Sequence, residues 1–234
     1  MTTLSDRYSR QMMLAEIGPE GQRRIMASSV LVIGLGGLGC PATLYLAGAG
    51  VGCLGLADHD VVSVSNLHRQ LLYCDSEVGT PKTEAARRRL SAASPSTLFN
   101  IYPHGINRDN AADIISQYDL VLDCCDNYAT RYLVDDTCAA LGKTWIFASL
   151  SGYRGMVSVF SPESPMRYGD LFADREELSA QSAASGGVIG PTAGVIGSVQ
   201  AAEAVKILAG NKSALDGRLL SVDLLNMDFN TIDL

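Results

Sequence analysis

The feature that most constrains the fold of this chain is an apolar run that enters a glycine-rich turn, Val30-Leu-Val-Ile-Gly34-Leu-Gly36-Gly37-Leu-Gly39. Such a run is typical of a buried parallel strand, and the small residues of 40–50 predict a helix directly after it. Glycines between a strand and a helix let the backbone approach a phosphate, whose charge meets the amides of the helix N-terminus. The motif alone fits NAD, FAD, S-adenosylmethionine or ATP.

Strand and helix patterns alternate along the rest of the chain. Strands are expected at 28–34, 52–58, 98–102, 119–124, 145–149 and 155–160, with two short ones in 218–234, and helices at 40–50, 82–92, 109–117, 129–141 and 191–209. Thr80 and Pro81 are expected to be the N-cap and first position of the helix at 82–92. The pattern predicts an α/β fold with a Rossmann-like, doubly wound, mostly parallel sheet and antiparallel C-terminal strands. We expect a single domain over 1–234.

The segment 161–187 differs in composition, being rich in Ser, Pro, Glu, Asp and Ala. It is too long for an ordinary connection, which predicts a crossover segment, a lid or a mobile loop. Its acids are expected to keep it solvated, with substrate contact as the alternative; they are Glu163, Asp174, Glu176 and Glu177.

Bulk composition excludes some classes of function. A net charge of -7 argues against broad binding to nucleic acid or to an anionic membrane. No apolar run approaches the roughly 20 residues that span a bilayer, and the first residues do not resemble a signal peptide. The expected location is the cytoplasm.

The six cysteines, Cys40, Cys53, Cys74, Cys124, Cys125 and Cys138, form no Cys-x-x-Cys pair. The histidines are not spaced with them as zinc ligands, so buried, reduced thiols are expected. Cys124 and Cys125 lie beside the predicted site, where either could be reactive.

Trp145 is expected in the core. The run Arg87-Arg-Arg89 is expected on a solvated helix face, with docking of a partner as the alternative.

Charged residues after three predicted strands indicate what the nucleotide is used for. Asp58 follows the second strand, where a carboxylate can hold ribose hydroxyls, whereas Asp60 is expected to be a solvated loop acid. Arg69 and Lys82 place two cations on successive connections, which suits nucleotidyl transfer better than hydride transfer. Asp126 follows another strand and can hold Mg²⁺. Taken singly, Lys82 would be a surface helix residue and Asp126 a helix N-cap.

These residues, in this order, resemble the ThiF/MoeB/HesA family, the bacterial relatives of ubiquitin-activating enzymes. The matching segments cover nearly the whole chain: Arg7-Tyr-Ser-Arg10-Gln11, 34–39, Leu46-Ala-Gly-Ala-Gly-Val-Gly52, Ser65-Asn-Leu-His-Arg-Gln70, Pro81-Lys82, 119–127 and Gly194-Val-Ile-Gly-Ser-Val-Gln200. The resemblance implies an adenylyltransferase that uses ATP and Mg²⁺ to activate the C-terminal Gly-Gly carboxylate of a ubiquitin-like sulfur carrier, of the thiamine or molybdopterin type, and releases pyrophosphate.

The resemblance also implies roles for individual residues. The glycine turn (Gly34, Gly36, Gly37, Gly39) and Asp58 would hold phosphate and ribose, and Asp126 would coordinate Mg²⁺. The residues expected around the triphosphate are Asn66, Arg69, Gln70 and Lys82, and Asn127 is expected among the nucleotide-binding residues. Arg10 would reach the phosphates of the opposite protomer, which makes a homodimer necessary. The catalytic set is then Arg10, Arg69, Lys82 and Asp126.

Two departures from the family pattern qualify this expectation. Family members commonly carry a zinc site built from two Cys-x-x-Cys pairs, but this chain has Arg167-Tyr-Gly-Asp170 where the first pair should fall, so no zinc is predicted. The loop cysteine of ThiF-like members is also absent, because Ser182-Ala-Ala-Ser-Gly186 carries no thiol. A separate sulfur donor is therefore expected.

Three alternatives remain at this point. The chain could adenylate a small-molecule or peptide carboxylate, or it could be a non-catalytic nucleotide-binding relative. An NAD-dependent oxidoreductase is disfavoured by the placement of the cations.

Overall fold

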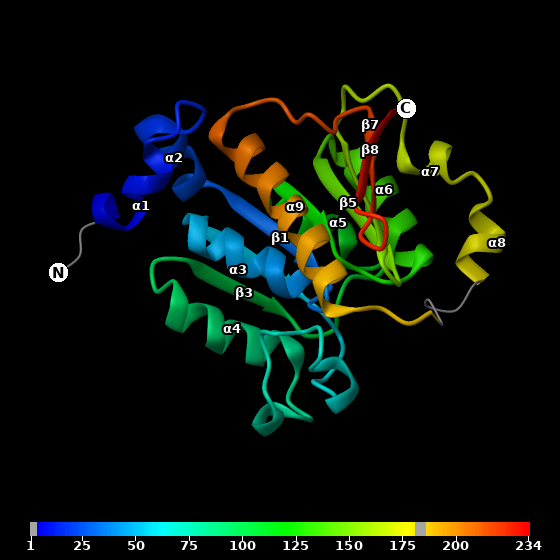
Figure 1. Ribbon diagram of the computed structural model, residues 1–234, viewed down its shortest axis with the longest axis horizontal. Helices are drawn as coiled ribbons and strands as arrows, with labels where there is room; N and C mark the ends of the chain where they lie inside the picture. Colours follow the sequence, from blue (N-terminus) through cyan, green and yellow to red (C-terminus); the bar gives the residue numbers. More distant parts are fainter. Residues whose placement is uncertain (1–3, 181–185) are drawn as a thin grey trace.

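One eight-stranded sheet forms the centre of the computed structural model, which describes residues 4–180 and 186–234. Its order is β3-β2-β1-β4-β5-β6-β7-β8, with parallel pairing from β3 to β5 and antiparallel pairing from β5 to β8. The strands are β1 (Ser29–Ile33), β2 (Cys53–Ala57), β3 (Leu98–Tyr102), β4 (Leu120–Asp123), β5 (Thr144–Ser151), β6 (Arg154–Phe160), β7 (Arg218–Asp223) and β8 (Asp228–Asp233). The predicted fold class is confirmed (Figure 1).

Helices cover both faces of this sheet. They are α1 (Leu4–Met12), α2 (Gly18–Ala27), α3 (Gly39–Ala49), α4 (Lys82–Ala93), α5 (Ala111–Ser116), α6 (Tyr128–Leu141), α7 (Tyr168–Leu171), α8 (Arg175–Ala180) and α9 (Gly190–Ala209). Short 3-10 turns occur at η1 (Val64–Asn66) and η2 (Asp75–Glu77). None of the described helices combines the length and apolar character needed to cross a bilayer.

Helices α1, α2, α7 and α8 were not predicted from the sequence. α2 begins Gly18-Pro19 and contains Gly21, and glycine lowers helix propensity, although the apolar residues of α2 recur at the helical period. α7 and α8 are short helices in a polar segment. The predicted N-cap of α4 was also wrong: Pro81 occupies the cap position and no side chain caps the helix. The Thr80 carbonyl instead accepts the backbone N–H of Val62.

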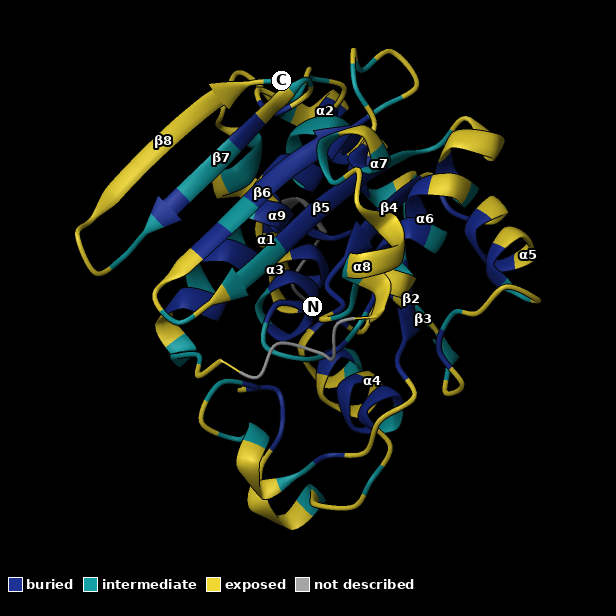
Figure 2. Ribbon diagram, turned by 90° about the vertical axis from the view of Figure 1, so that its right-hand side faces the viewer, coloured by how far each residue is buried: buried dark blue, intermediate teal, exposed yellow. Residues whose placement is uncertain are grey.

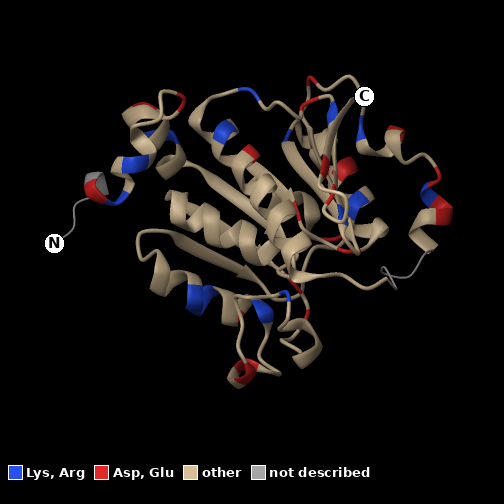
Figure 3. Ribbon diagram, in the orientation of Figure 1, with Lys and Arg blue, Asp and Glu red and all other residues tan. Residues whose placement is uncertain are grey.

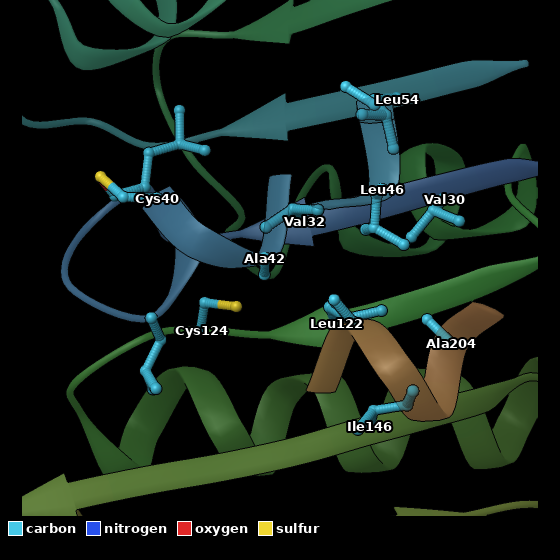
Figure 4. Packing of buried hydrophobic residues seen from close by; sticks show 14 of the residues in the cluster. Val30, Val32, Cys40, Ala42, Leu46, Leu54, Leu122, Cys124, Ile146 and Ala204 are labelled. Carbon is cyan, nitrogen blue, oxygen red and sulfur yellow. The ribbon is translucent and has the colours of Figure 1, made fainter. Parts of the chain in front are cut away.

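The core lies on both sides of the central strand because alternate side chains of a strand point to opposite faces. Val30 and Val32 join the cluster that faces α3, α4 and α9, and Leu31 and Ile33 join the cluster that faces α5 and α6. Figure 4 shows Val30 and Val32 among side chains of α3 and α9. Burying an aliphatic side chain of this size contributes roughly 1.5–3 kcal/mol. β8, at the edge of the sheet, is exposed along its whole length (Figure 2).

The long helix α9 joins the two halves of the sheet. It packs against α2 and α3 on one side and against β5 and β6 on the other. The fully buried Gln200 donates hydrogen bonds from Nε2 to the carbonyls of Asp123 (2.8 Å) and Ile146 (3.2 Å). This one side chain therefore ties α9 to two neighbouring parallel strands.

The segment 161–187 leads from β6 to α9 as a crossover, the first of the three forms expected from the sequence, and its described part contains α7 and α8. Tyr168 of α7 is fully buried in an aromatic cluster with Trp145, Phe147, Phe160 and Phe172. Trp145 is 2% exposed, which confirms its expected place in the core. The aromatic cluster anchors this part of the segment to the sheet. Residues 181–185, which include most of the thiol-free stretch Ser182–Gly186, lie outside the described residues.

Ion pairs fasten the same segment to α6. Arg167 lies 2.9 Å from the carboxylates of both Asp135 and Asp136, and Arg175 pairs with Asp136 while its guanidinium lies 4.6 Å from the Tyr132 ring centre. Burial raises the pKa of Asp135, and the positive charge of Arg167 and the Gly169 amide oppose that rise. These contacts attach the described part of the segment 161–187 to one face of α6.

Candidate active site

Three parallel strands end side by side at one edge of the sheet. In the register, Ile33 of β1 pairs with Ala57 of β2 and with Asp123 of β4, so the residues after these three strands emerge together. Because the chain order reverses between β1 and β4, this edge is the place where ligands bind in open α/β sheets. A cavity of about 650 Å³ opens there. Its volume lies within the range of small-molecule sites, about 300–1,000 Å³.

The glycine turn forms one wall of the cavity. Gly34 has a φ of +94°, and a Cβ there would lie 2.6 Å from the carbonyl oxygen of Cys124. A Cβ at Gly39 would lie only 2.0 Å from the Gly34 carbonyl oxygen. Gly36 and Gly37 line the cavity between them. Gly34 and Gly39 therefore close the turn, and Gly36 and Gly37 present backbone to a ligand.

Asp58 supports the glycine turn as well as lining the cavity. Its Oδ2 accepts the backbone N–H of Leu35 at 2.6 Å, and its Oδ1 accepts that of Asp60 at 2.8 Å. The side chain is 8% exposed. Asp58 lies where the sequence placed the ribose carboxylate, and it also fixes the position of the turn.

Lys82 is buried rather than on the surface. It is 4% exposed, and its Nζ lies 2.7 Å from Asp60 Oδ2 and 4.0 Å from Asp58 Oδ2. Burial raises the pKa of Asp60, but the Lys82 hydrogen bond and charge, with a smaller contribution from His59, outweigh it and lower that pKa. Asp60 is exposed, as expected for a loop acid, and it also lines the cavity and pairs with the lysine. Basic and acidic segments meet where the loop after β2 approaches α4 (Figure 3).

Arg69 and Gln70 reach the cavity from the loop that follows η1. The Arg69 Nη1 donates to the Ser65 carbonyl at 3.0 Å, and its side chain passes 3.7 Å from a Cβ built at Gly37. Gln70 is 3% exposed, and its Oε1 has no hydrogen-bond partner among the described residues. A buried amide oxygen without a partner costs free energy, which indicates that a ligand donor or water belongs beside it.

Asp126 follows β4 at the opposite wall of the cavity. The N-cap of α6 is not Asp126 but Asn127, whose Oδ1 accepts the backbone N–H of Thr130 at 2.9 Å. Asp126 is exposed, and no described residue hydrogen-bonds to its carboxylate or pairs with it. Its oxygens are therefore available to a divalent cation, for which carboxylate is a preferred ligand.

Among residues 4–180 and 186–234 no cluster of three or more His, Cys, Asp or Glu side chains could hold a metal ion. The expectation that the chain holds no zinc stays a prediction.

Two further arginines line the cavity and were missed from the sequence. Arg131 lies four residues after Asn127 in α6, so helical periodicity places the two on one face, which is the signal that could have found it. Arg154 lies just after the β5–β6 turn and pairs with Asp223 at 2.9 Å, and no motif marked it. With Ser149 and Ser151 it belongs to the end of the cavity away from the glycine turn.

Three predicted site residues do not line this cavity. Asn66 turns the loop instead, since its carbonyl accepts the backbone N–H groups of Arg69 and Gln70 at 3.0 Å. Gly39 packs against the carbonyl oxygen of Gly34 and so closes the glycine turn. Arg10 lies on α1, away from the cavity wall of its own chain. Their roles toward a nucleotide stay predictions.

The thiols near the site are buried. Burial raises the pKa of Cys124 and of Cys125 well above the ordinary value, and it raises that of Cys40 to about 12. The prediction of buried thiols is confirmed for Cys40, Cys124, Cys125 and Cys138, but Cys53 is half-buried and Cys74 is exposed.

A family model described as the ThiF family matches residues 8–234. The chain belongs to the ThiF family. This confirms the resemblance that the motifs indicated.

Curated relatives of this ThiF-family chain carry adenylyltransferase names. The chain is 43% identical over 235 residues to "Sulfur carrier protein adenylyltransferase" of Thermus thermophilus, covering 97% of this chain and 86% of the relative. It is 40% identical over 231 residues to "SAMP-activating enzyme E1" of Haloferax volcanii, covering 98% and 85%. It is also 43% identical over 229 residues to "Adenylyltransferase and sulfurtransferase MOCS3" of Culex quinquefasciatus, covering 97% of this chain and 52% of that protein. The chain thus spans about half the length of the MOCS3 relative.

Solved structures share the fold of this ThiF-family chain. E. coli MccB with ATP superposes with a TM-score of 0.86 at 20% identity, covering 97% of this chain and 71% of MccB. PaaA superposes with a TM-score of 0.82 at 19% identity, covering 98% and 73%. At these identities the likeness concerns the architecture alone.

Proposed function

We propose that this chain is an ATP-dependent adenylyltransferase that activates the C-terminal Gly-Gly carboxylate of a ubiquitin-like sulfur carrier and releases pyrophosphate. The single observation that carries the proposal is the gathering of Arg69, Lys82 and Asp126 around one cavity beside the glycine turn. The cavity wall also offers the unpartnered Gln70 Oε1. The names of relatives that are about 40% identical over nearly the whole chain point to the same chemistry.

The residues present fit a nucleoside triphosphate held with a divalent cation. Lys82 and Arg69 screen the repulsion between the incoming carboxylate and the phosphates, and they stabilise charge that builds on the leaving pyrophosphate. Asp58 faces the ribose, and Gly36 and Gly37 present their backbone to the phosphates. Asp126 would hold Mg²⁺, which supplies further neutralisation of phosphate charge when bound. None of these tasks needs a strong general base.

The test of this function is pyrophosphate–ATP isotope exchange with a small carrier protein that ends in Gly-Gly. We expect exchange with the intact carrier and none with a matched carrier that lacks its last glycine. Exchange that proceeds with a peptide or small carboxylic acid and no protein carrier would instead favour the small-molecule alternative. ATP binding without turnover for every acceptor would contradict the enzyme assignment.

We further propose that the active form is a homodimer in which Arg10 acts across the interface. A mixture of Arg10→Ala and Asp126→Ala protomers is then expected to regain activity, because half of the sites in each heterodimer carry both residues. Each parent variant alone should be nearly inactive. Heterodimers no more active than the parents would show that Arg10 does not act in the partner's site.

The sulfur is proposed to come from a separate donor, and the site of action is proposed to be the cytoplasm. The cysteines are all free, as is usual in a reducing compartment. Cys124 and Cys125, which line the cavity, are buried, and burial raises the pKa of both thiols, which disfavours the thiolate needed to attack an acyl-adenylate.

A further inference from the structure

One buried arginine of the cavity wall has a role that the proposed chemistry leaves unassigned. Arg131 lies in the first part of α6, is 7% exposed and lines the cavity. Its guanidinium lies 5.5 Å from the ring centre of Tyr128 and 5.3 Å from that of Phe147. These aromatic side chains hold the planar group in place.

The guanidinium of Arg131 joins three parts of the chain. Its Nη2 donates to the carbonyl of Cys125 at 3.0 Å, in the turn after β4, and approaches that of Ala148 in β5 at 3.4 Å. Its Nε lies 3.4 Å from Oδ2 of Asp123, the last residue of β4. Asp123 is fully buried, and its Oδ1 accepts the Cys125 backbone N–H at 3.0 Å.

Stability alone does not account for this arrangement. The Arg131 Nε and the Asp123 Oδ2 are both buried without a hydrogen bond, although they lie close to each other. Buried ion pairs with incomplete hydrogen bonding are often no more stable than apolar residues of similar volume. A pair kept under these conditions is a candidate for a functional role.

The turn that Arg131 holds is the one that carries Asp126. No described residue bonds to the Asp126 carboxylate, so the direction of that carboxylate depends on the backbone of the turn. Asn127 fixes the far end of the turn by capping α6, and Asp123 fixes the near end through the Cys125 N–H. Between these points the Cys125 carbonyl is held by Arg131.

We propose that Arg131 is a positioning residue for adenylation, which clamps the turn at 124–127 to β4 and β5 and so sets the Asp126 carboxylate toward the metal-bound phosphates. The proposal rests on the proposed function. The clamp is present in the protein without nucleotide, and it ties the metal carboxylate to β5, the strand that leads to the other end of the cavity.

The experiment compares Arg131→Met, Arg131→Lys and Asp126→Asn. The first readout is amide hydrogen exchange of the protein without nucleotide. Loss of a charge-assisted hydrogen bond in Arg131→Met is expected to speed exchange at 124–127 by about tenfold or more, with β2 and β3 unchanged. Arg131→Lys should lie between it and the wild type, because one ammonium cannot donate to the two carbonyls as Nη2 does and also place a second N–H beside Asp123 as Nε does. Asp126→Asn should leave exchange in the turn unchanged.

The second readout is the Mg²⁺ concentration that gives half-maximal pyrophosphate exchange. This Mg²⁺ concentration should rise by about tenfold in Arg131→Met, because the Asp126 carboxylate is then held less firmly. It should also rise in Asp126→Asn, which lacks that carboxylate. The matched control is Arg154→Met, which removes another cavity arginine that does not contact the turn and should leave its amide exchange unchanged.

Faster exchange throughout the sheet, or an unchanged Mg²⁺ requirement in a folded Arg131→Met protein, would overturn the positioning role. If the chain fails to catalyse pyrophosphate exchange with any acceptor, the proposed function falls. The amide exchange of the turn then still decides whether Arg131 clamps it.

Discussion

Replacing Lys82 by methionine is expected to slow adenylation by about 10²–10³-fold, the usual loss when one group that stabilises transition-state charge is removed. Methionine keeps the volume of the buried stem but deletes the cation that lies 2.7 Å from Asp60 and 4.0 Å from Asp58. The two carboxylates would then face the triphosphate without compensation. The measurement is the rate of pyrophosphate exchange at saturating ATP and Mg²⁺.

Folding must be measured separately for this variant, because removing the Lys82 ammonium leaves the carboxylates of Asp58 and Asp60 without their cation. We expect this loss to lower the free energy of unfolding by about 1–3 kcal/mol. Urea unfolding gives that cost directly. The matched control is Lys212→Met, which removes an exposed lysine in the connection between α9 and β7. It should leave both the rate and the stability near those of the wild type. A folded Lys82→Met protein that works at the normal rate would remove Lys82 from the mechanism.

Replacing Gly39 by alanine is expected to prevent stable folding, with a loss of more than about 4 kcal/mol. The added Cβ would lie 2.0 Å from the Gly34 carbonyl oxygen, which is backbone and cannot move aside without opening the turn between β1 and α3. At Gly34 the same turn lies so close to the Cys124 carbonyl that an added Cβ would be 2.6 Å from its oxygen. The measurements are soluble yield and the free energy of unfolding in urea.

Gly48→Ala is the matched control for this change, since it lies in the same helix. A Cβ at Gly48 has no neighbour within 4 Å, so alanine should stabilise the helix by about 0.5–1 kcal/mol. A Gly39→Ala protein as stable as the wild type would show that the turn can rearrange. Equal losses in both variants would mean that α3 tolerates no alanine, contrary to the contact argument.

The alternation of apolar strands and helices was enough to predict the sheet, because each strand signal is local. Helices α1 and α2 were not predicted, although their residues are amphipathic at the helical period. The same local reasoning missed α7, whose place depends on Tyr168 packing against Trp145 from a distant strand. Packing of this kind is decided by tertiary contacts that no short window contains.

Gly34, Asp58 and Asp126 could be predicted because they follow directly from strand ends, and they come together because their strands are neighbours in the sheet. Lys82 was predicted as a site residue from its place in the chain after Arg69 and from the family resemblance, whereas taken singly it fits a surface helix residue. Only the fold shows that the loop after β2 buries it beside Asp60. Arg131 was missed because its importance depends on contacts with Cys125, in the turn after β4, and with Ala148, within β5.

The way α9 bridges both halves of the sheet has a consequence for synthesis of the protein. β1 and α3 leave the ribosome early, whereas α9, which packs on their apolar side, is translated almost last. Until α9 has been translated, a nascent chain exposes that surface and the carbonyls of Asp123 and Ile146 that Gln200 later binds. Long-range contacts of this kind form slowly and leave the growing chain prone to aggregation. We therefore expect polypeptides that end before α9 to aggregate more readily than the 234-residue chain.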